Sequence, residues 1–509
     1  MPAHARVTSD IHKTNELVDV MPRQSFLSWG LTFLVTAIGA LVRWPRLSQP
    51  NEIVFDETYY VKDAYAILKN GYERTAVENA DQLILQGRTD VFEASGSFVA
   101  HPPMGKWVIA LGEQLGGLNS FGWRIGVAFM GTLLVLVTTR VAIRLIRSIW
   151  FGALAGFLIA IDGLAIVMSR TALLDGIMTT FLMLGIWAVL IDRDYSRNRI
   201  SRKLNSESSF GGRWTWHPYR IVAGIFFGLA IATKWNALWY LAVILLLSLI
   251  WDFTFRKIRR AKKPFLGTVF LDSWLLTIQV LFVAFFTYLF SWTGWIRSDN
   301  GWGRSTLESD SVINNWERIL TALYRYHEQI WNFHINLTTD HSYESYALTW
   351  PILYRPTSFF YKENLPNCAS SNCAQEVLAI GNPLIWWVSV IALLLLLLNF
   401  LRSRNWRAGT IVALFLAGWA PWLIFPERTM FYFYAISFLP FLVISISYVA
   451  NLIYQGLLAR GQSLKTFYVL GISLLIATII LSFYFYPIWT AISLPKEEWL
   501  ARMWFAKWI

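Results

Sequence analysis

The stretch LIWWVSVIALLLLLLNFL, residues 384–401, carries no charged side chain. A helix of about 18–20 apolar residues is long enough to cross the hydrocarbon core of a bilayer. Further apolar stretches of this kind are centred near residues 35, 133, 160, 182, 226, 244, 281, 416, 441 and 477. Hydrophobic residues make up 55% of the 509 and charged residues only 15%, against about 25% charged residues in ordinary soluble domains. The sequence therefore predicts an all-α polytopic membrane protein with about eleven transmembrane helices.

Basic residues follow every even-numbered apolar stretch, and this pattern gives the chain an orientation. After the sixth stretch the cluster consists of Arg256, Lys257, Arg259, Arg260, Lys262 and Lys263. Because such clusters are typical of cytoplasmic loops, we expect a cytoplasmic N-terminus, an extracytoplasmic C-terminus and residence in the plasma membrane. The same placement accounts for the formal net charge of +12 without any binding of nucleic acid.

Two long loops fall on the predicted outer side, at about 47–121 and 292–380. Loops of this length are usually functional. The first contains a short apolar stretch, 105–118, which we interpret as an interfacial helix. We therefore divide the chain into a cytoplasmic tail (1–25), a transmembrane catalytic module (26–291), the second outer loop (292–380) and C-terminal transmembrane helices (381–509).

The chain has two cysteines, Cys368 and Cys373, and both lie in the second predicted outer loop. An oxidising exterior favours a short disulfide between them. Two free thiols are the alternative, and a zinc site would need two further ligands.

The first outer loop opens with NEIVFDETYY, residues 51–60, which places Asp56 and Glu57 just past the first span. A carboxylate at a membrane surface is a candidate general base, and Tyr59 stands beside the pair. An acidic pair in a loop is also often simply solvated. The loop ends in AHPPMGKW, residues 100–107, where the prolines fix an extended approach that holds His101 and Lys106 at headgroup level.

Further ionisable residues fall at the same predicted depth, and they are Arg124, Arg170, Asp175, Lys234 and Arg428. Ionisable residues near membrane helices are costly and mark functional sites, although a cation can also simply snorkel to the interface. Cations at this depth suit the phosphate of a lipid-linked donor, and a carboxylate suits the proton of a hydroxyl acceptor. The convergence predicts transfer of a group from a lipid phosphate, with inversion at the reacting carbon.

The motifs FDETY, HPPMGK, SRTALLD, TKW and ERTMFY occur in this order, and YALTWPILYRP spans residues 346–356. In these motifs, which cover nearly the whole membrane region, the chain resembles the bacterial protein O-mannosyltransferases, membrane enzymes of the GT-C glycosyltransferase fold. The resemblance implies polyprenyl-phosphate mannose as the donor. It implies Ser and Thr hydroxyls of exported proteins as acceptors, which the secretion translocon would deliver.

The resemblance also assigns roles to residues. Catalysis falls on Asp56 with Glu57 beside it, and the family's arginine at the outer end of the second span falls on Arg124. The donor phosphate is expected at Arg124, Lys106, His101, Lys234 and Arg428, and the contacts of Lys106, Lys234 and Arg428 are inferred from depth and charge alone. The other site candidates are Arg170, Asp175 and Tyr59. No cofactor is certain, and any divalent-metal requirement is open. The second outer loop is too short for the β-trefoil domain that eukaryotic members insert there, which puts the family's heterodimer pairing in doubt.

Two other interpretations share some of these features. A related GT-C transferase that moves another sugar, such as an arabinose derivative, to lipid or glycan would share the first-loop carboxylate but not the later motifs. A transporter would place ionisable or unwound elements near the bilayer midplane and show internal repeats, whereas these charges lie at one boundary. The sequence therefore favours an inverting mannosyltransferase that acts on protein.

Overall fold

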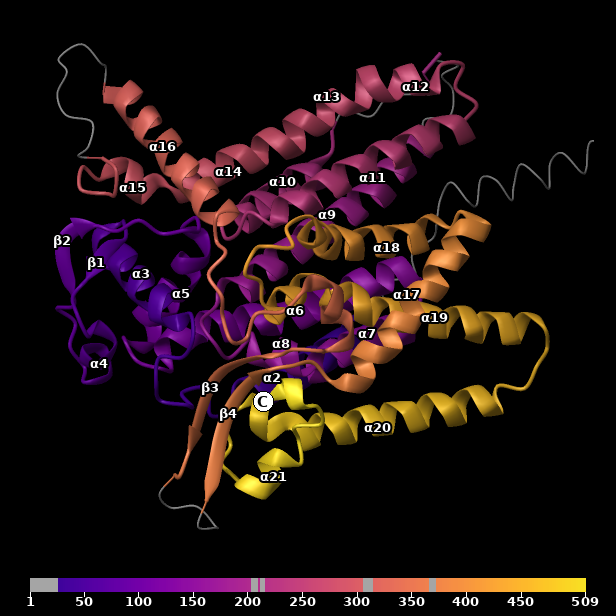
Figure 1. Cartoon of the computed structure of the whole chain (residues 1–509). Coiled ribbons are helices and arrows are strands. Elements are labelled where there is room, and N and C mark those ends of the chain that lie inside the picture. Colours follow the sequence, from indigo (N-terminus) through magenta and orange to yellow (C-terminus); the bar gives the residue numbers. More distant parts are fainter. Residues whose placement is uncertain (1–25, 203–208, 211–215, 305–314, 366–371) are drawn as a thin grey trace, which may run out of the picture.

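The computed structural model describes residues 26–202, 209–210, 216–304, 315–365 and 372–509. The predicted cytoplasmic tail, residues 1–25, lies outside the described residues. Helices dominate the fold, and they run side by side as one bundle whose long members cross the view of Figure 1. The predicted all-α class is therefore confirmed, and the described residues form two small sheets at one end.

Among the described residues, nine helical segments are long and apolar enough to cross a membrane. They are Phe26–Arg43 (α2), Gly122–Ile146 (α6), Leu174–Asn198 within α9 (Leu174–Arg202), Ala237–Ile258 (α11), Pro264–Ser291 (α12 to α14), Pro383–Ser403 (α17), Trp406–Ile424 (α18 and η4), Leu439–Ala459 (α19) and Lys465–Trp489 (α20). The other two predicted spans are also helical, as Ile149–Ile161 (α7) and Pro218–Ile231 (α10), but they are shorter. All eleven predicted centres thus fall on helices.

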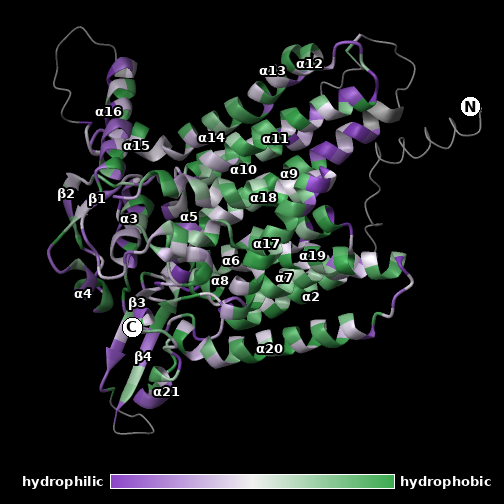
Figure 2. Ribbon diagram, turned by 45° about the vertical axis from the view of Figure 1, so that its right-hand side comes forward, coloured by the Kyte–Doolittle hydropathy of each residue, from purple (hydrophilic) through white to green (hydrophobic). Residues whose placement is uncertain are grey.

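The hydrophobic residues cover the long helices, and hydrophilic residues gather at both ends of the bundle (Figure 2). One end carries the small elements of the two long loops and of the C-terminus (Figure 1); we call it the loop end. These elements are α3 (Glu57–Asn70), β1 (Arg74–Ala76), α4 (Ala80–Leu85), β2 (Phe92–Gly96), α5 (Met104–Gly116), α15 (Thr293–Arg297), α16 (Asn315–Ile335), η3 (Ala347–Ile352), β3 (Thr357–Glu363), β4 (Cys373–Ala379), β5 (Leu494–Pro495), α21 (Lys496–Leu500) and η6 (Ala506–Trp508). The other end carries the basic ends of α6, α9, α11 and α17; we call it the basic end.

The two sheets are antiparallel and both lie at the loop end. Strands β1 and β2 form a hairpin, and β3, β4 and β5 form a second sheet in that order. In the second sheet, Ser358 lies opposite Leu378. Cys373, at the start of β4, is disulfide-bonded, and Cys368, the other cysteine of the chain, lies outside the described residues.

Helix α5 corresponds to the stretch that we predicted as an interfacial helix. It packs on α3 and α6, and a Cβ on Gly112 would lie only 2.5 Å from the carbonyl oxygen of Gly122 at the start of α6. Glycine is therefore required for this close approach. The contact fixes the first long loop to the bundle.

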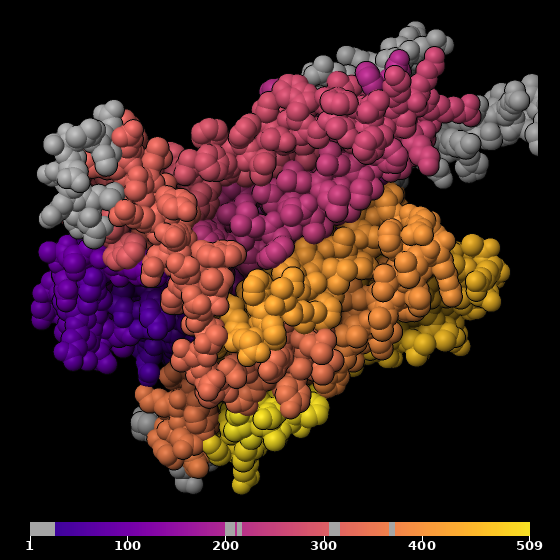
Figure 3. All heavy atoms as spheres, turned by 45° about the horizontal axis from the view of Figure 1, so that its top comes forward, coloured from indigo at the N-terminus to yellow at the C-terminus, as the bar shows by residue number. Residues whose placement is uncertain are grey.

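The two halves of the chain lie next to each other on one face of the bundle (Figure 3). The magenta helices α10 to α14 belong to one half, and the orange helices α17 and α18 belong to the other. Helix α11 packs directly on α18 between them. At the loop end, the segment from α16 to β3 passes from one half to the other (Figure 3).

Candidate functional site

Asp56 precedes α3 at the loop end and is held there by an unusual backbone. Phe55 has a φ of 47°, a conformation that strains a bulky residue. Its ring is fixed by stacking on Phe359 at 4.8 Å and by edge contacts with Phe431 and Phe433 at 5.8 and 5.7 Å. Because two segments distant in sequence hold the Phe55 ring, the direction of the next residue, Asp56, is fixed as well.

The Asp56 carboxylate has no hydrogen bond or ion pair with any residue that the structure describes. Burial raises the pKa of Asp56 to about 6; the Lys234 ammonium opposes this shift and the Asp175 carboxylate adds to it. The group therefore loses its proton near neutral pH and keeps both oxygens free to accept one.

Arg124, at the start of α6, is fully buried, and all five of its N–H groups have protein acceptors. Nε and one terminal nitrogen donate to the two carboxylate oxygens of Glu57, each at 2.8 Å. The remaining donors go to the carbonyl oxygens of Leu47, Pro50 and Glu52. Since a guanidinium has five N–H groups, Arg124 retains none for a phosphate, and this arrangement does not support the phosphate contact predicted for it.

Glu57 is just as fully engaged. Besides Arg124, its carboxylate accepts hydrogen bonds from the backbone N–H groups of Val54 at 3.1 Å and Ala172 at 2.9 Å. The side chain is completely buried, and four donors occupy its four acceptor positions. Glu57 is therefore a positioning residue that holds the first loop to α6 and to the segment before α9, while its neighbour Asp56 stays free.

Two further predicted cations are also committed to the protein. Lys106 on α5 is buried, forms a very short ion pair with Glu73, lies 4.0 Å from Asp63 and donates to the carbonyl oxygen of His101 at 3.0 Å. Arg170 is buried and donates to three backbone carbonyl oxygens at the end of α2, those of Arg43, Pro45 and Arg46. Their geometry fits structural roles, and burial separates Arg170, with 3% of its surface exposed, from the half-buried Arg428.

Asp175 and Lys234 form an ion pair beside Asp56. The Lys234 ammonium lies 2.8 and 2.9 Å from the two oxygens of Asp175 at the start of α9. It also lies 4.4 Å from the centre of the Tyr434 ring in η5 (Tyr432–Ser437), a cation–π distance. Two of its three N–H groups donate to Asp175, and the third has no hydrogen-bond acceptor among the described residues.

His101 and Arg428 complete the cationic side of the site through His334, which the sequence analysis did not select. The His101 and His334 rings stack at 5.0 Å, and Arg428 donates to the His334 carbonyl oxygen at 3.0 Å and approaches its Nδ1 at 3.4 Å. Burial lowers the pKa of His101 well below its usual range and that of His334 to about 4. Both imidazoles are therefore neutral at physiological pH.

Arg428 differs from the buried cations because it is only half-buried. Three of its five N–H groups donate to the protein, to two carbonyl oxygens and to the His334 ring. The other two are available to an anion. Tyr59, three positions after Asp56, is 63% exposed and makes no part of this cluster.

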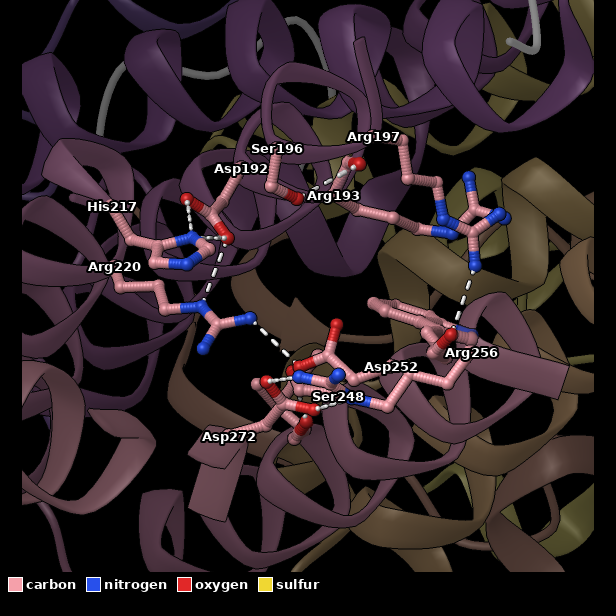
Figure 4. Close-up of polar contacts among 12 residues, drawn as sticks. Asp192, Arg193, Ser196, Arg197, His217, Arg220, Ser248, Asp252, Arg256 and Asp272 are labelled. Atoms are coloured by element: carbon pink, nitrogen blue, oxygen red, sulfur yellow. Dashed lines mark hydrogen bonds and ion pairs between the residues drawn. The ribbon is translucent and has the colours of Figure 1, made fainter. Parts of the chain in front are cut away.

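A second ionic cluster ties the helices together at the basic end (Figure 4). Arg220 donates to Asp192 and to Asp252 at 2.9 Å each, and His217 lies 3.1 Å from Asp192. Nearby, Arg256 pairs with Asp272 at 2.6 and 2.7 Å. Asp192 lies seventeen residues beyond Asp175 on the same helix α9, which separates the two clusters by about 25 Å.

Metal-binding groups are not concentrated in either cluster. Within the described ranges, no three His, Cys, Asp or Glu side chains are close enough together to hold a metal ion.

Two family models match the chain. Residues 33–296 match the family described as dolichyl-phosphate-mannose-protein mannosyltransferase, and residues 319–508 match the C-terminal four-transmembrane region of protein O-mannosyltransferases. The polyprenol-phosphate-mannose–protein mannosyltransferase of Mycolicibacterium smegmatis is 30% identical over 96% of this chain and 95% of its own length. The protein of the same name from Corynebacterium glutamicum is 28% identical over 94% and 93%.

Solved structures share the fold. A chain of the S. cerevisiae protein O-mannosyltransferase Pmt1–Pmt2 complex bound to the sugar donor superposes with a TM-score of 0.72 at 14% identity, over 97% of this chain and 94% of that one. The oligosaccharyltransferase of Archaeoglobus fulgidus reaches 0.50 at 13% identity, over 92% and 56%. These likenesses confirm the predicted GT-C fold.

Proposed function

The chain belongs to the dolichyl-phosphate-mannose–protein mannosyltransferase family, and we propose that it moves mannose from a polyprenyl-phosphate carrier to Ser and Thr hydroxyls of proteins. The family predicted from the sequence motifs is confirmed. Relatives that match over nearly their whole length carry the name of this activity. The observation that supports the assignment to this site is the free Asp56 carboxylate near two ion pairs, Glu57 with Arg124 and Asp175 with Lys234.

In the proposed reaction Asp56 is the general base. The acceptor oxygen attacks the anomeric carbon of mannose and its proton passes to the Asp56 carboxylate. The bond from that carbon to the phosphate oxygen breaks, and the polyprenyl phosphate leaves with the electron pair. Attack from the face opposite the phosphate inverts the anomeric centre. A pKa of about 6 keeps Asp56 ionised at neutral pH and still basic enough to accept the proton.

The donor phosphate is assigned to the cations that retain free N–H groups. Arg428 has two such groups and Lys234 has one. Preorganised donors of this kind stabilise the negative charge that develops on a leaving phosphate. His334 uses both ring nitrogens within the protein, one toward Arg428 and one toward the Ala100 carbonyl oxygen. The stacked, neutral His101 keeps its Nδ1 without a hydrogen-bond partner among the described residues. Arg124, Lys106, Arg170 and Glu57 act as positioning residues instead of ligands.

The orientation in the membrane is part of the proposal. Basic residues at the end remote from Asp56 support a cytoplasmic basic end and an extracytoplasmic loop end. The protein would then meet exported acceptors as they emerge, delivered by the secretion translocon. In the proposed domain division, residues 26–291 form the catalytic transmembrane module, 292–380 form the second outer loop, and 381–509 supply the C-terminal helices.

A membrane assay with two radiolabelled donors tests this function. Membranes containing the chain are given polyprenyl-phosphate mannose and a Ser/Thr/Pro-rich peptide, and label on the peptide is expected. A peptide with every Ser and Thr replaced by Ala should remain unlabelled, as should the reaction with Asp56→Asn membranes. Label from a polyprenyl-phosphate pentose, or label in lipid and not in peptide, would overturn the assignment in favour of another GT-C transfer.

A further inference from the structure

A groove lies between α17, α19 and α20, away from the residues of the proposed active site. Its volume is about 620 Å³. Apolar side chains of the three helices line most of it, among them Ile391, Leu395, Ile453 and Leu474. Its lining ends at the turn between α19 and α20 with the polar residues Gln462, Ser463 and Thr466.

The groove is held open because α20 is anchored at both ends. At the turn, the Phe467 ring contacts Tyr454 of α19 and Phe151 of α7 at 5.7 and 6.5 Å. Toward the loop end, the side chain of Asn382 donates to Ser482 Oγ at 2.8 Å and to the Thr478 carbonyl oxygen at 2.9 Å. These contacts fix α20 to the bundle on either side of the groove.

Small residues create the space between these anchors. Ala392 on α17, Ala450 on α19 and Gly471 on α20 all line the groove. A Cβ on Gly471 would meet no atom within 4 Å. Only 11% of the residues in the most apolar part of α20 are buried within the protein. Most of this helix therefore faces the surrounding membrane.

The size of the groove and the charge at its end select the occupant. A transmembrane helix of 10 Å diameter and 30 Å length occupies on the order of 2,400 Å³, several times the volume of the groove. A single hydrocarbon chain fits instead. Arg460 and Lys465, both exposed, flank the polar end of the groove, and basic residues at the mouth of a groove between transmembrane helices attract anionic lipid headgroups.

The groove is distinct from the donor site. Helix α19 begins just after η5, whose Tyr434 contacts Lys234. Its 21 residues end at the turn that carries Arg460 and Lys465, which we call the basic turn. The basic turn is therefore about 30 Å from the start of α19. A headgroup at this turn belongs to the leaflet opposite the one that holds the donor phosphate.

We propose that the groove binds one acyl chain of an anionic phospholipid from the leaflet at the basic end. The chain lies against Ala392, Ala450 and Gly471, and Arg460 and Lys465 hold the phosphate. No covalent step is involved. The lipid fills the space between α20 and the rest of the bundle and so becomes part of the packing of the C-terminal helices.

Two matched glycine substitutions test this site. Gly471→Leu fills the groove, whereas Gly456→Leu makes the same change on α19 at a glycine that also has open space around it but does not line the groove. The full chain is exchanged into nanodiscs of phosphatidylglycerol, extracted in mild detergent and weighed by native mass spectrometry. We expect about one retained phosphatidylglycerol in the unmodified protein and in Gly456→Leu, and at least a fivefold loss in Gly471→Leu, with transferase activity preserved.

The headgroup is tested in the same way. Arg460→Gln combined with Lys465→Gln should reduce retention of phosphatidylglycerol to the level found with phosphatidylcholine. Equal retention in Gly471→Leu and the unmodified protein would overturn the site. So would a retained polyprenyl phosphate in place of the phospholipid, or a dimer that Gly471→Leu converts to a monomer, since each identifies a different occupant.

Discussion

Both ends of the bundle contain buried ion pairs, but the two clusters are completed differently. At the basic end, Asp192 and Asp272 both accept from arginine side chains (Figure 4). At the loop end, Glu57 pairs with Arg124 and Asp175 with Lys234, yet Asp56 has no hydrogen bond or ion pair with the described residues. An unpaired buried carboxylate is costly. Glu113 on α5 is also buried without a hydrogen-bond partner in the described part of the chain, so the proposal of Asp56 as the base rests on its unpaired carboxylate together with its place beside Lys234 and Asp175.

Removing the unpaired carboxylate should have the largest effect on chemistry. Asp56→Asn keeps the size of the side chain and removes the base, so we expect kcat to fall by about 10²-fold or more. Because Asp56 makes no hydrogen bond that the amide would break, the folded yield and donor binding should stay close to those of the unmodified protein. The measurement is single-turnover transfer from labelled donor to peptide.

The same change in the other cluster is the control. Asp192→Asn at the basic end should leave kcat per folded molecule unchanged, because Asp192 lies about 25 Å along α9 from the site. Near-normal turnover by Asp56→Asn would remove Asp56 from the mechanism.

Breaking a pair in either cluster should mainly cost stability. Glu57→Gln leaves the Arg124 guanidinium buried without its counter-charge, and the loss should be about 3–5 kcal/mol. Asp192→Asn leaves Arg220 paired with Asp252 alone, so its loss should be smaller. Thermal unfolding in detergent measures both. Glu57→Gln should also lower kcat because Glu57 holds the backbone that carries Asp56.

An exposed pair completes this series. Arg88 and Asp90 form an ion pair in which both side chains are more than half exposed, and Arg88→Ala should leave the unfolding temperature unchanged. If Glu57→Gln were equally silent, the view of Glu57 as a positioning residue would be wrong.

The smallest expected effect is a shift in the pH dependence. Transfer requires ionised Asp56, so the rate should fall as the pH drops through about 6. Lys234→Met removes a charge that lowers the Asp56 pKa, and the acid limb should move to higher pH. Asp175→Asn removes a charge that raises it, and the limb should move to lower pH. Profiles of kcat/KM for the two variants that move in the same direction would contradict this assignment.

Much of the fold followed from the sequence because hydrophobic length and charge are local properties. All eleven apolar stretches proved helical, and Asp56, Asp175, Lys234 and Arg428 lie at the loop end of the bundle. The two short helices, α7 and α10, were harder to class, because burial among other helices makes a segment apolar whether or not it is long enough to span the bilayer alone.

The partners of these charges could not be read from the sequence. Arg124 pairs with Glu57 across 67 positions and Lys106 with Glu73 across 33. The neighbouring sequence does not distinguish an arginine with a protein partner from one that is available to a phosphate. His334 was missed because it lies on α16, an amphipathic helix of the second long loop without a recognised motif. Tyr434 had a signal, since it closes the aromatic run that follows Arg428.

The segment 169–175 joins most of the structure around the site. Its Ser169 hydroxyl accepts a hydrogen bond from the Arg43 side chain. Its Arg170 side chain donates three hydrogen bonds to backbone carbonyl oxygens at the end of α2. A backbone amide in the same segment supports Glu57, and its last residue pairs with Lys234. Local opening here would release α2, the first loop and the α10–α11 junction in one step, so these parts share a single opening free energy. We therefore expect the parts of the protein around Asp56 to open together, as one cooperative unit.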